Sequence, residues 1–168
     1  MSTKQTSREY FRSLVIIYYA LIAGQLFFCL IAFFLHQTGN LDLGAKELTD
    51  IFIFIVPLFV IGGFFGSKIV FKNRLKAAKD QTNLFAKMTD YRGALVVRYA
   101  LLEGPSFFAI IVYLLTGNLL FLGMSLLIIA YFFIIRPTSG DAITDLELSI
   151  IEEQLVNDPN SEIAELDN

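Results

Sequence analysis

Glu103 is the residue whose type and position most suggest chemistry, because it lies inside a long apolar run, residues 93–115. A carboxylate at the centre of a membrane helix costs about 2.5–3.5 kcal/mol to insert, so such residues usually face neighbouring helices and have a polar partner. The candidate partners at a similar expected depth are Gln25, Tyr19, Ser106 and Ser125. We expect Glu103 to be either a buried structural group or a proton or cation site.

Two neighbours in the sequence set the surroundings of Glu103. Arg98 lies five residues earlier, which is about 140° around a helix, so the two charges do not form a pair on one helix face. Arg98 is therefore a second candidate buried polar group. Pro105 follows two residues later and leaves the carbonyl near Leu101 without its helix donor, which predicts a kink. Pro57 predicts a kink in the preceding apolar run.

The composition is that of an integral membrane protein. Hydrophobic residues make up 55% of the 168 positions and charged residues 17%, whereas soluble domains carry about 25% charge. Four apolar runs have the length of a membrane-spanning helix: 13–35, 50–71, 93–115 and 119–135. The expected fold is an all-α membrane protein of four spans, arranged as two tandem helical hairpins, with a short helix in the C-terminal tail.

The runs divide the chain into an N-terminal segment (1–12), a first hairpin (13–71), a basic linker (72–92), a second hairpin (93–136) and an acidic tail (137–168). The N-terminal segment has three Lys or Arg and the linker six, against one in the loop 36–49. Loops rich in Lys and Arg stay in the cytoplasm, so both termini and the linker are expected there. The abundance of Phe, Ile and Leu favours a bacterial cytoplasmic (inner) membrane.

The two hairpins share an internal similarity. Shifting residues 11–35 by 80 positions makes nine of 25 residues identical to those of 91–115, including Gly24 with Gly104. This indicates a tandem duplication. Copies of two spans keep one orientation, so they are expected to be parallel repeats about an axis along the membrane normal. Ala23 stands opposite Glu103, so only the second copy carries the carboxylate.

The basic linker has helical periodicity over residues 72–90, with a Lys-rich stripe and an apolar stripe. This pattern predicts either a basic helix lying on anionic lipid or a continuation of the second span into the cytoplasm. The alternative is positive charge that sets the orientation of the spans and has no further role. Contacts with lipid headgroups are expected for Lys68, Lys72, Lys76, Lys79, Arg92 and Arg136.

The acidic tail contains nine Asp or Glu and no Lys or Arg. Thr144 and Glu147 have the spacing of a capping box, and the residues around and after them predict one helix of about three turns, with Leu146, Ile150, Ile151 and Leu155 on an apolar stripe. Residues beyond 159 are expected to be disordered. Because the charges are opposite, we expect the tail helix to pack against the basic linker.

The sequence contains no nucleophile with an adjacent base, metal-ligand cluster, phosphate loop or dinucleotide fingerprint. We therefore expect no enzyme, no cofactor and no metal site; a lipid-modifying enzyme has almost no support. Cys29 is interpreted as a small buried apolar group. The favoured hypothesis is a non-enzymatic accessory or assembly protein of the membrane, and the alternative is an oligomeric small transporter or channel module that uses Glu103. The expected partners are the bilayer and either further copies or a larger membrane complex, not nucleic acid.

Overall fold

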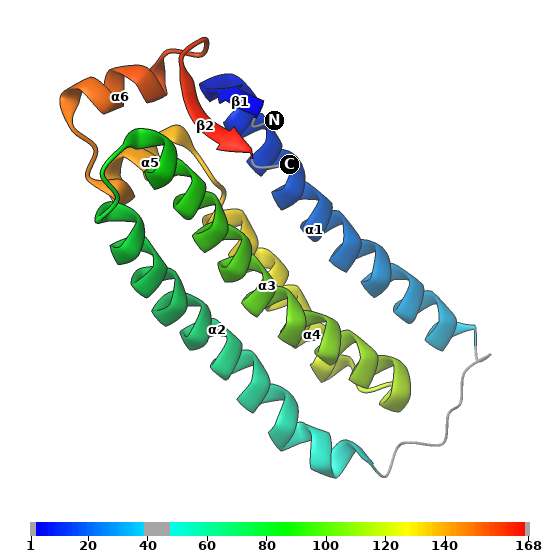
Figure 1. Ribbon diagram of the computed structural model, residues 1–168. Helices are drawn as coiled ribbons and strands as arrows, with labels where there is room; N and C mark the ends of the chain where they lie inside the picture. The colour runs from blue at the N-terminus through cyan, green and yellow to red at the C-terminus, as the bar shows by residue number, and fades with distance from the viewer. Residues whose placement is uncertain (1–2, 39–47, 167–168) are drawn as a thin grey trace. The chain divides into compact units, whose positions relative to one another are not determined.

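The chain folds into long helices and one small sheet (Figure 1). The computed structural model describes residues 3–38 and 48–166, so most of the expected loop 36–49 lies outside the described residues. The elements within these ranges are β1 (Thr3–Thr6), α1 (Ser7–Gln37), α2 (Thr49–Lys79), α3 (Leu84–Thr116), α4 (Leu119–Ile134), α5 (Ser139–Leu146), α6 (Ile150–Asn157) and β2 (Glu162–Leu166).

Three helices, α1, α2 and α3, are long and apolar enough to cross a membrane, and α4 together with α5 supplies at most one more. Large apolar side chains such as Phe27, Phe54 and Leu127 are exposed on these helices. A surface of this kind suits lipid, because soluble monomers rarely leave large contiguous apolar patches open to water. The structure confirms the helical class and the membrane setting, with three or four candidate spans.

A two-stranded antiparallel sheet departs from the expected all-α fold. β1 pairs with β2, in a register that runs from Thr3 opposite Leu166 to Thr6 opposite Glu162 (Figure 1). The ion pair between Lys4 and Glu162, 2.8 Å from Nζ to Oε2, supports the same pairing. The expectation that the tail is disordered beyond residue 159 is therefore wrong for β2. Its backbone groups are satisfied by β1, a partner distant in the sequence.

The acidic tail forms two short helices where the sequence predicts one. α5 begins earlier than expected, because the Thr138 hydroxyl accepts a hydrogen bond from the Asp141 amide and caps the helix. The capping box predicted from Thr144 is wrong, since Glu147 ends α5 with a left-handed φ of 50°. The capping box of the tail forms instead between Ser149 and Glu152 at the start of α6. The predicted apolar stripe is wrong as well, because Leu146 is buried in α5 whereas Ile150, Ile151 and Leu155 are exposed on α6.

The basic linker does not form a helix of its own. α2 continues through Lys79, α3 begins at Leu84, and only residues 80–83 separate them. The Asn83 side chain accepts a hydrogen bond from the Ala86 amide and so satisfies a free donor in the first turn of α3. Of the two expectations for this segment, the structure shows the continuation of the second apolar helix.

The described residues group into two compact units. The first unit contains residues 3–18, 68–98 and 136–166. Its core includes Tyr10, Met88, Tyr91 and Leu146, all of them buried, and the Tyr10 hydroxyl donates to the Met88 carbonyl at 2.6 Å. The unit thus joins the start of α1, the ends of α2 and α3 nearest the linker, and the tail.

The second unit contains residues 19–38, 48–67 and 99–135. A tight turn joins α3 to α4 within it, as the Thr-Gly-Asn sequence predicts. Gly117 has a φ of +71°, and a Cβ at this position would collide with the His36 ring, so only glycine fits. The Asn118 side chain accepts from the Leu120 amide and caps α4. The turn fixes α3 and α4 as an antiparallel helical hairpin.

Candidate intramembrane polar site

Glu103 lies on α3 in the second unit, and its side chain is half-buried. No hydrogen bond or ion pair joins it to any residue that the structure describes. The described part of the second unit also contains no Lys or Arg, so none of its described residues supplies a Lys or Arg to pair with the carboxylate. Ala100 and Gly104 lie on the same helix face and are exposed, and a Cβ added at Gly104 would meet nothing within 4 Å. The carboxylate therefore lies beside an open patch of small residues.

Ser106 and Ser125 form a polar contact of their own. Both side chains are fully buried, and their hydroxyl oxygens lie 2.8 Å apart between α3 and α4. The Cys29 sulfur on α1 lies 3.7 Å from the Ser125 hydroxyl. Three helices of the second unit thus meet at a small hydroxyl and thiol cluster. Neither serine bonds to Glu103, although both were among its candidate partners.

Cys29 is the member of this cluster that the sequence analysis missed. It is buried, as expected, but it contributes a polar contact rather than an apolar surface alone. The sequence feature that could have pointed to this contact is the spacing of four residues between Gln25 and Cys29, which places both side chains on one face of α1.

Gln25 and Tyr19, the other two candidate partners, do not reach Glu103 either. Gln25 is fully buried, and its amide nitrogen donates to the Leu21 carbonyl one turn earlier, at 3.3 Å. Its Oε1 atom has no hydrogen-bond partner among the described residues. Tyr19 is exposed on α1. The expected polar neighbourhood around Glu103 is therefore not assembled among the residues that the structure describes.

Pro105 lies inside α3 and Pro57 inside α2, and each helix continues past its proline. Pro105 has no amide hydrogen to donate to the Leu101 carbonyl. Gly63 of α2 lies directly against this point, because a Cβ at position 63 would come within 2.8 Å of the Leu101 oxygen and 2.5 Å of the Pro105 Cγ. The backbone of α2 thus covers the carbonyl that the proline leaves free.

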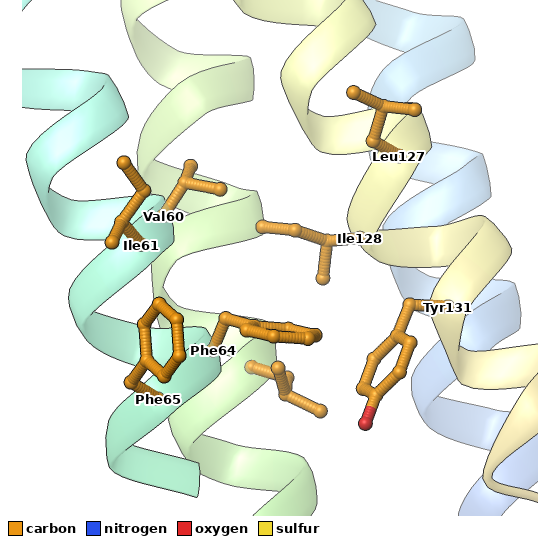
Figure 2. Close-up of a pocket in the computed structure, with 8 residues that line it drawn as sticks. Val60, Ile61, Phe64, Phe65, Leu127, Ile128 and Tyr131 are labelled. Atoms are coloured by element: carbon orange, nitrogen blue, oxygen red, sulfur yellow. The ribbon is translucent and has the colours of Figure 1, made fainter. Parts of the chain in front are cut away.

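An apolar pocket of about 280 Å³ opens between α2, α3 and α4 (Figure 2). Figure 2 shows Phe64 and Tyr131 extending toward one another across it, with ring centroids 4.9 Å apart. The complete lining is Val60, Ile61, Phe64, Phe65, Leu102, Leu127, Ile128 and Tyr131. Apart from the tyrosine hydroxyl these side chains are hydrocarbon, so the pocket suits an apolar group and offers no charge to hold a polar ligand.

Arg98 belongs to the first unit, where it contacts an aromatic ring. Its guanidinium carbon lies 4.6 Å from the centroid of the Phe71 ring, within the range of a cation–π interaction. Its Nε atom is buried and has no hydrogen-bond partner among the described residues. Arg98 is half-buried and contacts Phe71, and its role as a structural polar group stays a prediction.

The six residues expected at lipid headgroups separate into two groups. Lys68, Lys72, Lys76 and Arg136 have exposed side chains, which leaves the expectation open. Arg92 does not fit it, because its Nη2 atom donates to the Gln5 side chain at 2.6 Å and to the Ser13 hydroxyl at 3.1 Å. Its guanidinium also lies 4.5 Å from the centroid of the Tyr10 ring. Arg92 therefore links elements of the first unit, since its Nη2 atom donates to two protein groups.

Lys79 is the sixth, and it contacts the acidic tail. It pairs with Glu147 at 2.6 Å, while Lys87 pairs with Glu152 at 2.8 Å. The second pair is the more enclosed, since its side chains are 15% and 18% exposed. Burial disfavours the charged form of Glu152, but hydrogen bonds from Lys87 and Ser149 outweigh it and hold the pKa of this carboxyl below its usual range. The expected contact between tail and linker is confirmed.

Among the described residues, no three His, Cys, Asp or Glu side chains gather closely enough to hold a metal ion. Comparison with protein-family models, with curated proteins and with solved structures finds no match. The fold and the site define a small helical membrane protein with a half-buried carboxylate on an apolar helix, and its function has to be argued from that geometry.

Proposed function

We propose that this protein is a non-enzymatic accessory or assembly protein of the membrane, which docks on a spanning helix of another protein through the face of α3 that carries Glu103. The observation that carries the proposal is that Glu103 has no partner among the described residues. A carboxylate at this depth costs about 2.5–3.5 kcal/mol unless it is paired or protonated. A partner that supplies a cation or a hydrogen-bond donor removes this cost, so binding is favoured.

The surroundings of Glu103 support a helix as the docking partner. Ala100 and Gly104 leave the backbone of α3 accessible, and small residues at this spacing let two membrane helices approach closely. Such an approach brings the donor on the partner helix within reach of the carboxylate.

A different protein fits this face better than a second copy of the chain. A second copy brings a second Glu103 and no Lys or Arg from the described part of the same unit. Two carboxylates placed together repel each other unless they share a proton. We therefore expect the partner to carry a basic, hydroxyl or amide side chain within its span.

The test is a pull-down from mild detergent, with the native mass of the purified complex measured alongside. Wild type is compared with Glu103→Gln, Glu103→Leu and the control Ile111→Val, which alters an exposed apolar residue of the same helix. We expect the same unrelated membrane protein with wild type and the control, and its loss with Glu103→Leu. A partner retained in full by Glu103→Leu, or no partner at all, contradicts the proposal.

The alternative is an oligomeric small transporter or channel module in which Glu103 binds a proton or a cation. A half-buried carboxylate without a protein partner is able to accept a proton, which favours this alternative. Several copies would then surround the path, because the described residues of one chain hold no cluster of three His, Cys, Asp or Glu side chains that could bind a metal cation. A homo-oligomer without a further partner, together with ion flux in liposomes that Glu103→Gln abolishes, would support transport.

The membrane architecture we propose is four spans with both termini and the linker in the cytoplasm. β1 pairs with β2, so the segments before α1 and after α6 lie on one side and the number of crossings is even. The pair between Lys87 and Glu152 supports the same side for the linker. Four spans satisfy both conditions, with α4 as the fourth. The positive charge of residues 72–92 favours the cytoplasmic side, in a bacterial inner membrane.

The proposed duplication is supported by matching burial along α1 and α3. The buried residues Ile22, Gln25, Cys29 and Ala32 correspond, 80 positions later, to the buried residues Leu102, Pro105, Ala109 and Val112. The aligned glycines Gly24 and Gly104 are both exposed. These four equivalent positions thus face inward in both helices, as tandem copies of one hairpin would, whereas α3 also buries Ser106, Ile110 and Tyr113, whose counterparts in α1 are exposed.

A further inference from the structure

Helix α6 presents its apolar side chains outward. Glu152 pairs with Lys87, and Val156, one turn later, is buried, so these two residues mark the face by which the helix is held. The opposite stripe carries Ile150, Ile151 and Leu155, which are 76%, 73% and 39% exposed. Amphipathic helices of folded proteins normally turn such residues inward. The open side of this short polar helix therefore carries three large apolar residues within six positions. Such an exposed apolar patch indicates a docking surface.

The charges around this stripe select the kind of partner. Glu153 lies on the exposed part of α6, and Asp158 lies exposed at its C-terminal end. The tail from residue 137 onward contains no Lys or Arg. Anionic lipid headgroups would be repelled by these carboxylates, whereas a basic protein segment would be attracted.

The size of the stripe excludes a dimer made through α6 alone. A stable interface buries about 800 Å² on each partner, with about 20–30 residues a side, and three side chains fall well short of this. A second copy would also bring acidic residues against acidic residues. A short amphipathic helix with a basic rim is the partner that fits both the size and the charge.

We propose that the outward stripe of α6, Ile150, Ile151 and Leu155 with Glu153 beside them, binds a basic amphipathic helix of another protein. The apolar residues bury against the apolar face of that helix, and the surrounding carboxylates pair with its Lys or Arg side chains. This proposal is independent of Glu103, so either one can fail without the other.

The first experiment places a single tryptophan at the stripe. The chain contains no Trp, so Ile151→Trp gives one fluorescent reporter in the full-length protein. The protein is held in phosphatidylcholine bicelles and titrated with a synthetic amphipathic peptide of Leu and Lys. We expect acrylamide to quench the tryptophan before the peptide is added and much less afterwards. Strong quenching by brominated phosphatidylcholine in the absence of peptide would mean that the stripe lies in the membrane, and would overturn the proposal.

The second experiment uses the same peptide with a fluorescent label, and measures anisotropy after subtraction of its binding to empty bicelles. We expect Ile150→Ser with Leu155→Ser to weaken binding at least tenfold, and Glu153→Gln to weaken it about threefold. The control Asp80→Asn removes an exposed acidic residue elsewhere in the same unit and should leave binding unchanged. Since the changed side chains are exposed, thermal unfolding should not shift. Equal binding by the double variant and wild type would overturn the proposal.

Discussion

Gly63 and Pro105 lie so close together that no larger residue fits at position 63. A Cβ there would come within 2.5 Å of the Pro105 Cγ and 2.8 Å of the Leu101 carbonyl oxygen. Pro105 of α3 leaves the Leu101 carbonyl without its helix donor, and Gly63 of α2 covers that carbonyl. The contact therefore depends on both residues.

Gly63→Ala should destabilise the protein by about 1–3 kcal/mol, because the added methyl group overpacks the contact with α3. This loss should exceed the gain of up to about 1 kcal/mol that alanine brings to a helix. Gly62→Ala is the matched control, since a Cβ at position 62 meets nothing within 4 Å. Thermal unfolding in mild detergent, followed by circular dichroism, measures both. Equal stability of the two variants would contradict the close approach of α2 and α3.

Glu152→Gln should destabilise the first unit by about 1–2 kcal/mol, because the pair with Lys87 is largely enclosed. Glu147→Gln is the matched control: its carboxylate, paired with Lys79, is 76% exposed, and we expect no measurable change. Trypsin cleavage after Lys87 and Lys79 reports release of the tail from the linker. Faster cleavage is expected for the Glu152 variant alone, and equal cleavage of both variants would count against the enclosed pair.

The same pair predicts the direction of a pH effect. The pKa of Glu152 is lower in the folded protein than in the unfolded chain, so the unfolded state binds the proton more readily. The stabilisation is therefore present above the ordinary pKa of a glutamate and is lost as the pH falls through the lowered pKa. The stability difference between wild type and Glu152→Gln should shrink below about pH 4. A difference that stays constant from pH 7 to pH 3 would argue that Lys87 does not stabilise the charged carboxylate.

Ser149→Ala should fray α6, because the Ser149 hydroxyl accepts from the Glu152 amide and the Glu152 carboxylate accepts from the Ser149 amide. Losing such a cap costs about 1 kcal/mol. Thr144→Ala is the control, since the exposed Thr144 hydroxyl only donates to the Gly140 carbonyl within α5. Hydrogen exchange of the amides of residues 150–157 should accelerate about fivefold in the Ser149 variant. A loss of about 1 kcal/mol in the free energy of local opening raises the open population, and with it the exchange rate, by about this factor. Faster exchange with the Thr144 variant instead would restore the capping box predicted from the sequence.

Arg92→Lys should lower the free energy of unfolding by about 1–3 kcal/mol although it keeps the charge. A lysine cannot donate from one planar group to Gln5 and Ser13 while stacking on Tyr10. Arg74→Lys is the control, because Arg74 is exposed. Thermal unfolding of the two variants should separate them clearly. If both are as stable as wild type, Arg92 acts as a point charge near the membrane surface, as the sequence alone predicts.

The sequence analysis identified the apolar helices, and its runs 93–115 and 119–135 leave only residues 116–118 to connect α3 to α4, because these features depend on a few neighbouring residues. A helix of the third run follows from its length and hydropathy, and Thr116-Gly117-Asn118 contains both the glycine and the cap that the turn requires. It also found the attraction between tail and linker, since opposite net charge is visible in composition. It failed for Thr144 and Glu147, where a cap at Thr138 sets an earlier start for α5.

The candidate site was harder to predict, because it depends on how helices face one another. Ser106 and Ser125 were selected for their expected depth, yet they bond to each other, and Ser125 also contacts Cys29. Depth is a property of each helix by itself, whereas a hydrogen bond also requires the rotation of two helices about their axes. The sequence carries no direct measure of that rotation.

The sequence by itself determined that this is a helical membrane protein, which segments are apolar, and that Glu103 is a carboxylate inside one of them. These properties follow from local composition and from the cost of placing polar groups in hydrocarbon. Only the tertiary structure decided that β1 pairs with β2, that Arg92 turns toward Tyr10, and that Glu103 has no partner among the described residues. Each of these depends on side chains or strands brought together from distant segments, and such contacts exist only once the chain has folded.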